Sequence, residues 1–497
     1  MTASALVICS DCLAGLRDLP DNSIDAVVTD PPSGIAFMGA DWDKDKGGRD
    51  AWIDWLAEIM REVWRVTKPG GHALVWALPR TQHWTATAVE DAGWEVRDVL
   101  MHVFGSGFPK SMDVSKQIDR ALGAKREKVK TPMTPKSTAG KGSSVDIDPR
   151  PWMLEARGKG YHEHDGPTPA TEEAKQWAGW GTALKPSYEG WILARKPLDG
   201  TIARNCIEHG TGALNIDGCR VGWSSKAERA QVNARSSPNS RYVGENSNGA
   251  TGWGAGQIRA VDDITNPGGR WPPHLLLSHG PDCGETCADG CPVADMDAQS
   301  GAAGSVVKFK QCGNINKIRD GGGDGPSVGW SGRKNALSSY GDTGGASRFF
   351  PVFRYVAKPS TAEKSAGLGH RAPATGGEAT GRKDGSAGLD NPRAGAGRNG
   401  GALNIHPTVK PRGLMEWLVK LITPPGGVVL DPFTGSGSTG VAAVGLGFDF
   451  VGFEMSEEFA GIARDRIGHT VAGVEIETVG IEDYEPKPEA TGQGRLF

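Results

Sequence analysis

Residues 431–440, Asp-Pro-Phe-Thr-Gly-Ser-Gly-Ser-Thr-Gly, constrain the fold more than any other stretch of the chain. The apolar residues 427–430 before them predict a buried parallel strand, and the small apolar residues 439–446 after them predict a helix. Glycines 435, 437 and 440 have the G-x-G-x-x-G spacing. Glycine allows a sharp turn and close approach of a ligand, and the helix N-terminus offers free N–H groups. This stretch therefore predicts a strand, a ligand-binding loop and a helix.

An acidic residue at the end of the next predicted strand, Glu454 after 449–453, makes the loop more specific. The glycine pattern alone is weak, because the chain has 72 glycines. A carboxylate about 20 residues beyond such a loop can accept hydrogen bonds from both ribose hydroxyls of an adenosine ligand. NAD and S-adenosylmethionine (SAM) both suit this arrangement. The alternative is a tight turn between strand and helix with Glu454 simply exposed.

A second motif, Asp30-Pro31-Pro32-Ser33, follows the predicted strand 24–29 far upstream. In open α/β sheets ligands bind at the carboxyl ends of strands, which is where this rigid acidic turn lies. Prolines lack an N–H donor and leave their carbonyls free to accept. Asp30 and the Pro31 carbonyl are therefore suited to hold an exocyclic –NH2 group from two directions.

Together the two motifs resemble those of the DNA methyltransferases that modify adenine N6 or cytosine N4. The Asp-Pro-Pro motif comes first and the Asp-Pro-Phe-x-Gly-x-Gly motif last, an order similar to the circularly permuted β-class. The resemblance covers residues 1–104 and 346–470 well and the region between them only in patches. It implies an α/β, doubly wound, Rossmann-like SAM methyltransferase sheet with a large irregular target-recognition insert.

The resemblance also implies roles for individual residues. Lys410 would meet the methionine carboxylate of SAM, and Asp11 its adenine amino group. The implied catalytic residues are Asp30, Pro31, Pro32, Ser33 and Phe37. The implied SAM-binding residues are Asp11, Thr408, Lys410, Pro411, Asp431, Pro432, Phe433, Gly435, Ser436, Gly437, Ser438, Thr439 and Glu454. Position 33 departs from the family, which has an aromatic residue there to stack on the target base. Either Phe37 or Trp42 supplies the ring, or the base is held otherwise.

Four segments are predicted: a catalytic half at 1–104, a recognition insert at 105–345, a SAM-binding half at 346–470 and an acidic tail at 471–497. Within the insert, residues 105–141 hold nine Lys/Arg against three Asp/Glu. This excess favours contacts with DNA phosphates over a solvated helix and linker. The aromatic stripe of the predicted helix 50–67 is assigned to the core. The region 94–104 is expected to be an antiparallel strand, and 347–358 a further strand.

The insert also contains one histidine and three cysteines within thirteen residues: His279, Cys283, Cys287 and Cys291. This is the ligand set of a structural zinc site, although the spacing differs from the usual C-x2-C pair. Ordinary reduced thiols and, less in keeping with a cytoplasmic chain, a disulfide are the alternatives.

Composition indicates where the protein is expected to act, but it does not identify the reaction. A net charge of −4 and 38% hydrophobic residues are typical of a soluble protein, and no stretch has the ~20 apolar residues of a membrane span. We expect a cytoplasmic protein with no membrane association, present as a monomer or homodimer. Double-stranded DNA is the expected partner, and a cognate restriction nuclease a further candidate.

The predicted function is transfer of a methyl group from SAM to adenine N6 in double-stranded DNA. Asp rather than Ser at the start of the catalytic motif favours adenine, with cytosine N4 as the alternative. Other classes left open are an inactive DNA-binding homologue and an RNA or protein-glutamine methyltransferase. No Pro-Cys nucleophile lies near these motifs, which argues against methylation of cytosine C5.

Overall fold

The structure is a computed structural model of the chain. It describes residues 3–36, 41–105, 107, 111–132, 159–223, 225–226, 228–230, 266–280, 283, 286–289, 291–300, 345–353, 361–374, 403–470 and 475–477. Among these residues no helix is long and apolar enough to cross a membrane.

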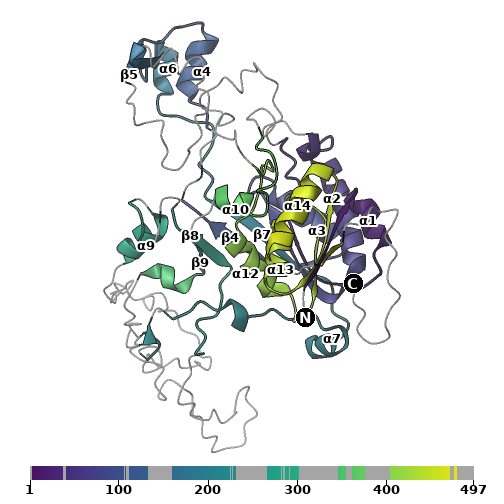
Figure 1. Cartoon of the computed structure of the whole chain (residues 1–497). Helices are drawn as coiled ribbons and strands as arrows, with labels where there is room; N and C mark the ends of the chain where they lie inside the picture. The colour runs from purple at the N-terminus through teal and green to yellow at the C-terminus, as the bar shows by residue number, and fades with distance from the viewer. Residues whose placement is uncertain are drawn as a thin grey trace, which may run out of the picture.

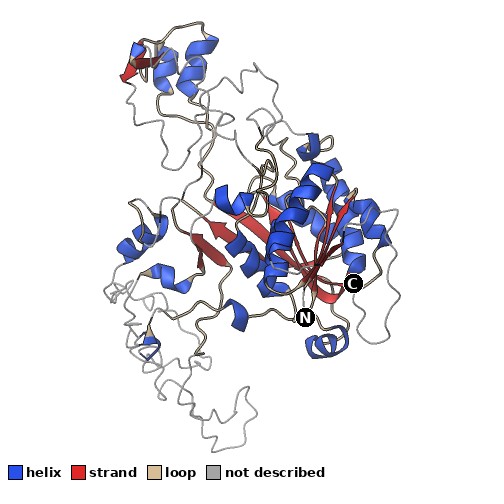
Figure 2. Ribbon diagram, in the orientation of Figure 1, coloured by secondary structure: helices blue, strands red, loops and turns tan. Residues whose placement is uncertain are grey.

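A single ten-stranded sheet forms the centre of the molecule, in the order β12-β1-β11-β10-β2-β3-β7-β4-β8-β9 (Figures 1 and 2). Its strands in chain order are β1 (Ser4–Cys9), β2 (Ile24–Thr29), β3 (Thr67–Ala77), β4 (Glu95–Val103), β7 (Tyr188–Arg195), β8 (Leu275–Ser278), β9 (Val352–Phe353), β10 (Val428–Asp431), β11 (Asp449–Glu454) and β12 (Glu475–Glu477). A separate two-stranded sheet pairs β5 (Lys128–Pro132) with β6 (Tyr161–Asp165).

Strand direction confirms the predicted α/β sheet. All neighbours from β12 to β3 are parallel, as are β4 with β8 and β8 with β9. The antiparallel strand is β7, which pairs with both β3 and β4. The strand predicted as antiparallel at 94–104 is β4, and it does pair antiparallel with β7. Because β7 also runs antiparallel to β3 and lies between them, β4 has the same direction as β3. Of the strand expected at 347–358, the described residues contain β9, preceded by the 3-10 turn η6 (Ala346–Phe349), and residues 354–358 lie outside the described residues.

The helices, in chain order, are α1 (Cys12–Asp18), α2 (Arg49–Val66), α3 (Gln82–Asp91), α4 (Val114–Ala121), α6 (Glu172–Gln176), α7 (Ile202–His209), α9 (Pro292–Ser300), α10 (Thr361–Ser365), α12 (Arg412–Ile422), α13 (Ser438–Gly445) and α14 (Glu457–Thr470). Two further 3-10 turns are η2 (Asp41–Asp43) and η3 (Asp217–Cys219).

Helices cover both faces of the sheet because successive strand residues point to opposite sides. On β1, Leu6 and Ile8 pack into a core shared with α1, α2 and α3. Val7 packs into a second core shared with α12, α13 and α14. Since both faces of β1 and β2 are buried, these strands do not alternate between apolar and polar residues, and in β2 even Asp25 and Thr29 are buried.

A small unit made of α4, α6 and the β5–β6 pair stands apart from the central sheet (Figure 1). An ion pair fixes its interior: Arg126 Nε lies 2.6 Å from Asp119 Oδ2, and the two side chains are only 2% and 3% exposed. Arg126 Nη2 also donates to Ser115 Oγ at 2.8 Å. The unit is therefore held partly by a buried polar network.

The strand order also creates a switch point between β10 and β2, which are parallel neighbours. From β10 the chain passes through α13 to β11 on one side, and from β2 it passes through α2 to β3 on the other. Connections that leave neighbouring strands in opposite directions open a crevice at their carboxyl ends, where ligands bind in such folds. The two predicted motifs follow these two strands.

Candidate active site

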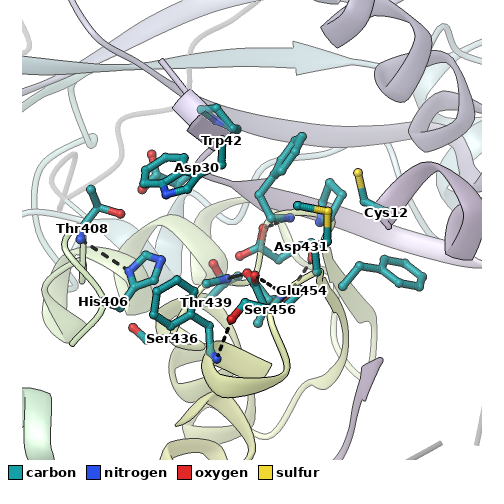
Figure 3. A pocket seen from close by; sticks show the side chains of 18 of the residues that line it. Cys12, Asp30, Trp42, His406, Thr408, Asp431, Ser436, Thr439, Glu454 and Ser456 are labelled. Carbon is teal, nitrogen blue, oxygen red and sulfur yellow. Dashed lines mark hydrogen bonds between the residues drawn. The ribbon is translucent and has the colours of Figure 1, made fainter. Parts of the chain in front are cut away.

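A cavity of about 340 Å³ lies at the carboxyl ends of β1, β2, β10 and β11. Each of these strands brings one acidic side chain to it: Asp11 after β1, Asp30 after β2, Asp431 on β10 and Glu454 on β11. Figure 3 shows Asp30 and Trp42 together at one side of the cavity and Ser436 and Ser456 at the other. Segments some 400 residues apart in the chain thus form one site.

The glycine loop between β10 and α13 needs its glycines for two separate reasons. Gly435 and Gly437 have φ angles of 53° and 79°, in the left-handed region that favours glycine. A Cβ on Gly435 would also lie 2.7 Å from His406 Nε2. Glycine at 435 therefore lets the loop pass close to His406, and glycine at 437 lets the chain turn into α13 beside Ala463.

Asp431 joins the loop to the neighbouring strand. Its Oδ1 accepts hydrogen bonds from Thr29 Oγ1 at 2.7 Å and from the Phe433 backbone N–H at 3.1 Å. Burial raises the pKa of Asp431 to about 6 despite these hydrogen bonds. This carboxyl group therefore holds the ends of β2 and β10 together at the floor of the cavity.

The Glu454 carboxylate is oriented by the backbone on both of its oxygens. Oε2 accepts from the Gly435 N–H and Oε1 from the Ser456 N–H, each at 2.9 Å. Burial raises the pKa of Glu454, and the backbone N–H groups oppose that rise. The side chain is fixed beside the glycine loop, where the sequence predicts a ribose.

Asp30 forms an ion pair that the sequence did not predict. Lys410 Nζ lies 2.8 Å from Asp30 Oδ2 and 4.1 Å from the centre of the Trp76 ring. Trp76 Nε1 in turn donates to Glu189 Oε2 on β7 at 3.0 Å. Lys410, assigned by resemblance to the carboxylate of SAM, thus contacts the Asp-Pro-Pro motif in this structure.

Ser33 is engaged away from the cavity, although its motif partners Asp30 and Pro32 line it. Its hydroxyl lies 3.0 and 3.1 Å from the two carboxylate oxygens of Asp43, and its N–H donates to the same group. Asp43 is fully buried, so Ser33 anchors the turn. Of the two candidate rings, Trp42 lines the cavity and is 37% exposed, whereas Phe37 lies outside the described residues.

The segment 406–411 crosses the loop before α12 begins. The His406 ring packs edge-on against Phe459, with 4.7 Å between ring centres. Burial lowers the pKa of His406 to about 3, so its ring is neutral at ordinary pH. Its Nδ1 accepts from the Thr408 N–H at 3.4 Å, and Ser438 Oγ accepts from the Lys410 N–H at 3.3 Å. The segment is thereby tied to α13.

The structure gathers most of the predicted cofactor residues around the cavity. Those that line it are Asp11, Thr408, Lys410, Asp431, Pro432, Phe433, Gly435, Ser436, Ser438, Thr439 and Glu454. Gly437 and Pro411 do not line it, and they act instead as the N-terminal caps of α13 and α12. Asp11 caps α1 by accepting from the Leu13 and Ala14 N–H groups. Pro31, a predicted catalytic residue, is buried and is not among the residues that line the cavity.

Sequence reasoning missed several residues of the cavity wall. They are Ser10, Cys12, Lys46, Trp55, Ile59, His406, Met415, Phe453, Met455, Ser456 and Phe459. Trp55 was assigned to the core with its helix, which is correct for Trp52 at 0% exposure. Trp55 instead lies at the edge of that stripe, with its ring 5.9 Å from that of Phe433. Adjacency to the motifs was the available indication for Ser456 and His406.

Away from the cavity, the four predicted zinc ligands converge after β8. The ligand atoms of His279, Cys283, Cys287 and Cys291 all lie within 4.8 Å of one another. His279 Nδ1 is 3.4 Å from Cys287 Sγ and 3.5 Å from Cys291 Sγ. One nitrogen and three sulfurs around one point are a donor set that suits a tetrahedral zinc ion.

The sheet, the glycine loop and the Glu454 carboxylate form the arrangement that the sequence predicts for a nucleoside cofactor. A family model described as DNA methylase, covering N6 and N4 methyltransferases, matches residues 24–147 and 377–465. These segments contain both motifs and make up less than half of the chain, and over them the chain is similar to the DNA amino-methyltransferases.

Similar proteins match only part of the chain in sequence. Type II methyltransferase M2.DpnII of Streptococcus pneumoniae is 47% identical over 62 residues, and M2.LlaDCHI of Lactococcus lactis subsp. cremoris is 42% identical over 62. Each match covers 12% of this chain, and the chain spans 23% of the length of these relatives.

Solved structures resemble the chain over most of its length at low identity. The Thermus thermophilus protein TTHA0409, described as a putative DNA modification methylase and complexed with SAM, is 12% identical, with a TM-score of 0.34 and coverage of 96% of this chain and 99% of that one. The cytosine-N4-specific PvuII DNA methyltransferase is 11% identical, with a TM-score of 0.36 and coverage of 94% and 87%.

Proposed function

We propose that the protein transfers a methyl group from SAM to an exocyclic amino nitrogen in double-stranded DNA, with adenine N6 as the preferred target. The observation that carries this proposal is the meeting of Asp30 and the glycine loop in one cavity, at the ends of neighbouring strands. Cytosine N4 is the second candidate, since an Asp-Pro-Pro turn suits either amine.

The cavity residues divide into two groups with different tasks. Glu454 is positioned to accept hydrogen bonds from the ribose hydroxyls of SAM, and Phe433 offers a ring face for its adenine. Asp30 and the Pro31 carbonyl accept hydrogen bonds from the target –NH2 group. SAM supplies a methyl group activated by its positive sulfur.

The target amine is a weak nucleophile because its lone pair is delocalised into the base. Two hydrogen bonds from its N–H groups favour a pyramidal nitrogen, which directs the lone pair outward. Positioning and electrostatics then carry the reaction without a covalent enzyme intermediate. The base must leave the helix to reach the cavity, at a cost of a few kcal/mol of unstacking.

Analysis of host DNA tests the proposal. The chain is expressed in cells that lack DNA methylation, and the digested genomic DNA is examined for modified nucleosides by mass spectrometry. N6-methyladenine at a defined sequence is the expected result, and N4-methylcytosine would select the second candidate. Unmodified DNA with methylated RNA or protein would overturn the proposal, and no methylation at all would favour an inactive homologue.

The cofactor assignment predicts that Glu454→Ala weakens SAM binding by roughly 1–3 kcal/mol, the range for a charge-assisted hydrogen bond. Titration calorimetry of the purified protein measures the change. Glu458→Ala is a matched control, because Glu458 is an exposed glutamate at the start of α14 and does not line the cavity. Unchanged affinity in Glu454→Ala would mean that the ribose binds elsewhere.

The DNA assignment predicts affinity that falls steeply with added salt, since bound phosphates release counterions. The structure refines which basic residues of the insert can take part. Arg126 is buried against Asp119 and cannot reach DNA, and Lys110 lies outside the described residues. Lys125, Lys128 and Lys130 are exposed, although Lys128 also pairs with Asp165 at 2.7 Å.

We therefore expect the triple variant Lys125→Gln, Lys128→Gln, Lys130→Gln to reduce the slope of log affinity against log salt by up to about 3. Fluorescence anisotropy with labelled duplex DNA gives this slope. Replacing Arg17, Arg61 and Arg97 by Gln offers a control with the same charge change, because these residues are exposed, lie outside the insert and do not line the cavity. If the triple variant keeps the wild-type slope, the basic segment does not contact DNA phosphates and serves only as a linker.

For the four residues after β8 we propose one structural zinc ion. Their convergence within 4.8 Å supports it, and so does the small size of the adjacent apolar cluster, whose buried members are Leu277, Cys291 and Val293. A site with four protein ligands leaves no position for a reactive water, so its role is to stabilise the fold.

A further inference from the structure

The ion pair between Asp30 and Lys410 joins the catalytic motif to a segment 380 residues later in the chain. Lys410 Nζ lies 2.8 Å from Asp30 Oδ2, and the two side chains are 11% and 20% exposed respectively. The ammonium group also lies over the Trp76 ring at 4.1 Å, a cation–π distance. Shielding from water makes such a pair stronger and more specific in geometry than a surface ion pair.

The pair engages only one of the two oxygens of Asp30. Lys410 donates to Oδ2, and no hydrogen bond from a described residue reaches Oδ1. A carboxylate can accept on both oxygens, so Oδ1 remains available to a donor in the cavity. Lys410 therefore fixes the rotation of the carboxylate without filling its capacity.

The surrounding charges show why Asp30 needs a cation. Two other carboxyl groups, Glu189 from β7 and Asp43 from η2, raise the pKa of Asp30. Asp30 in turn raises the pKa of Asp431 on β10. Burial is the largest influence and raises the pKa of Asp30, whereas Lys410 lowers it. Lys410 is the cation that pairs with Asp30 among the described residues.

We propose that Lys410 is a positioning residue that keeps Asp30 ionised and turns its Oδ1 toward the target amine. This inference rests on the proposed function, and it replaces the role at the carboxylate of SAM that resemblance implied. A protonated Asp30 would lose half of its accepting capacity and the negative charge that stabilises a nitrogen becoming positive. Removing Lys410 therefore has its main effect on the reaction and little effect on cofactor binding.

The variants Lys410→Met and Lys410→Arg distinguish a role in positioning Asp30 from a role in binding SAM. In Lys410→Met we expect the single-turnover rate of methylation at pH 7 to fall on the order of 100-fold, because a reacting group that is misplaced by about 1 Å has an effect of this size. The acid limb of its pH–rate profile moves to higher pH, because Asp30 then protonates more easily, and SAM affinity stays within about twofold. Lys410→Arg retains the charge and returns the acid limb to its wild-type position. Lys420→Met, on α12 and outside the cavity wall, is the control.

An opposite pattern would overturn the inference. If Lys410→Met loses SAM affinity about tenfold or more while the acid limb stays in place, Lys410 is a cofactor ligand.

A double-mutant cycle on thermal unfolding tests the Asp30–Lys410 pair without any activity measurement. Lys410→Met and Asp30→Asn should each lower the melting temperature, and the combined variant should recover part of the loss. Additive losses would contradict a coupled pair. A wild-type enzyme that methylates no DNA, with this coupling present, would contradict the proposed function alone.

Discussion

Replacing Asp30 by alanine should abolish methyl transfer to DNA while SAM still binds with an affinity within a few-fold of wild type. Asp30 lies at the end of β2, whereas Glu454 lies at the end of β11, two strands away in the sheet. Loss of Asp30 removes the acceptor for the target amine and leaves Glu454 and its backbone donors in place. Rapid-quench single-turnover assays measure the reaction, and calorimetry measures SAM binding.

The alanine variant also leaves Lys410 as a buried cation without its partner, which can destabilise the chain. Asp30→Asn therefore accompanies it, because asparagine keeps the shape and one acceptor oxygen. Asp18→Ala is a matched control, since Asp18 is an exposed aspartate at the end of α1. Near-normal turnover in folded Asp30→Ala would remove Asp30 from the mechanism.

The parts of the fold that could be predicted are those determined by local sequence. Strand β2 was predicted with the bounds that the structure gives, because both its faces are buried and its ends are marked by a turn and a double proline. The placement of β7 could not be predicted in the same way. Its sequence shows a buried strand, but its insertion between β3 and β4 depends on contacts more than 80 residues away.

The same distinction applies to the candidate site: residues determined by local sequence could be predicted, and contacts between distant segments could not. Residues at strand ends were found because the carboxyl ends of neighbouring parallel strands must meet at one edge. The partners of the side chains were not found. No local sequence pattern encodes the pairing of Lys410 with Asp30 or of Ser33 with Asp43. Arg126 shows the same limit, because a basic run does not reveal which member is buried. The domain bounds and the individual residue roles stay predictions.

Loss of zinc should have the largest structural effect of any change outside the cavity. Metal binding at structural sites stabilises small domains by on the order of 10 kcal/mol, so removing one ligand removes most of the stability of the unit that it holds. Here that unit is the end of β8, the loop that follows it and the start of α9. His279 also donates its N–H to the Phe353 carbonyl at 3.0 Å, which connects the site to β9 at the edge of the sheet.

Elemental analysis of protein purified without a metal-binding tag should give one equivalent of zinc. Cys291→Ser should lower this to less than about a tenth and increase hydrogen exchange across residues 275–300. SAM affinity should stay unchanged, because none of the four ligands lines the cavity. Cys206→Ser is the control, since Cys206 on α7 lies outside the cluster. Wild-type protein with less than a tenth of an equivalent of zinc and three freely titratable thiols at 283, 287 and 291 would make these cysteines ordinary reduced residues.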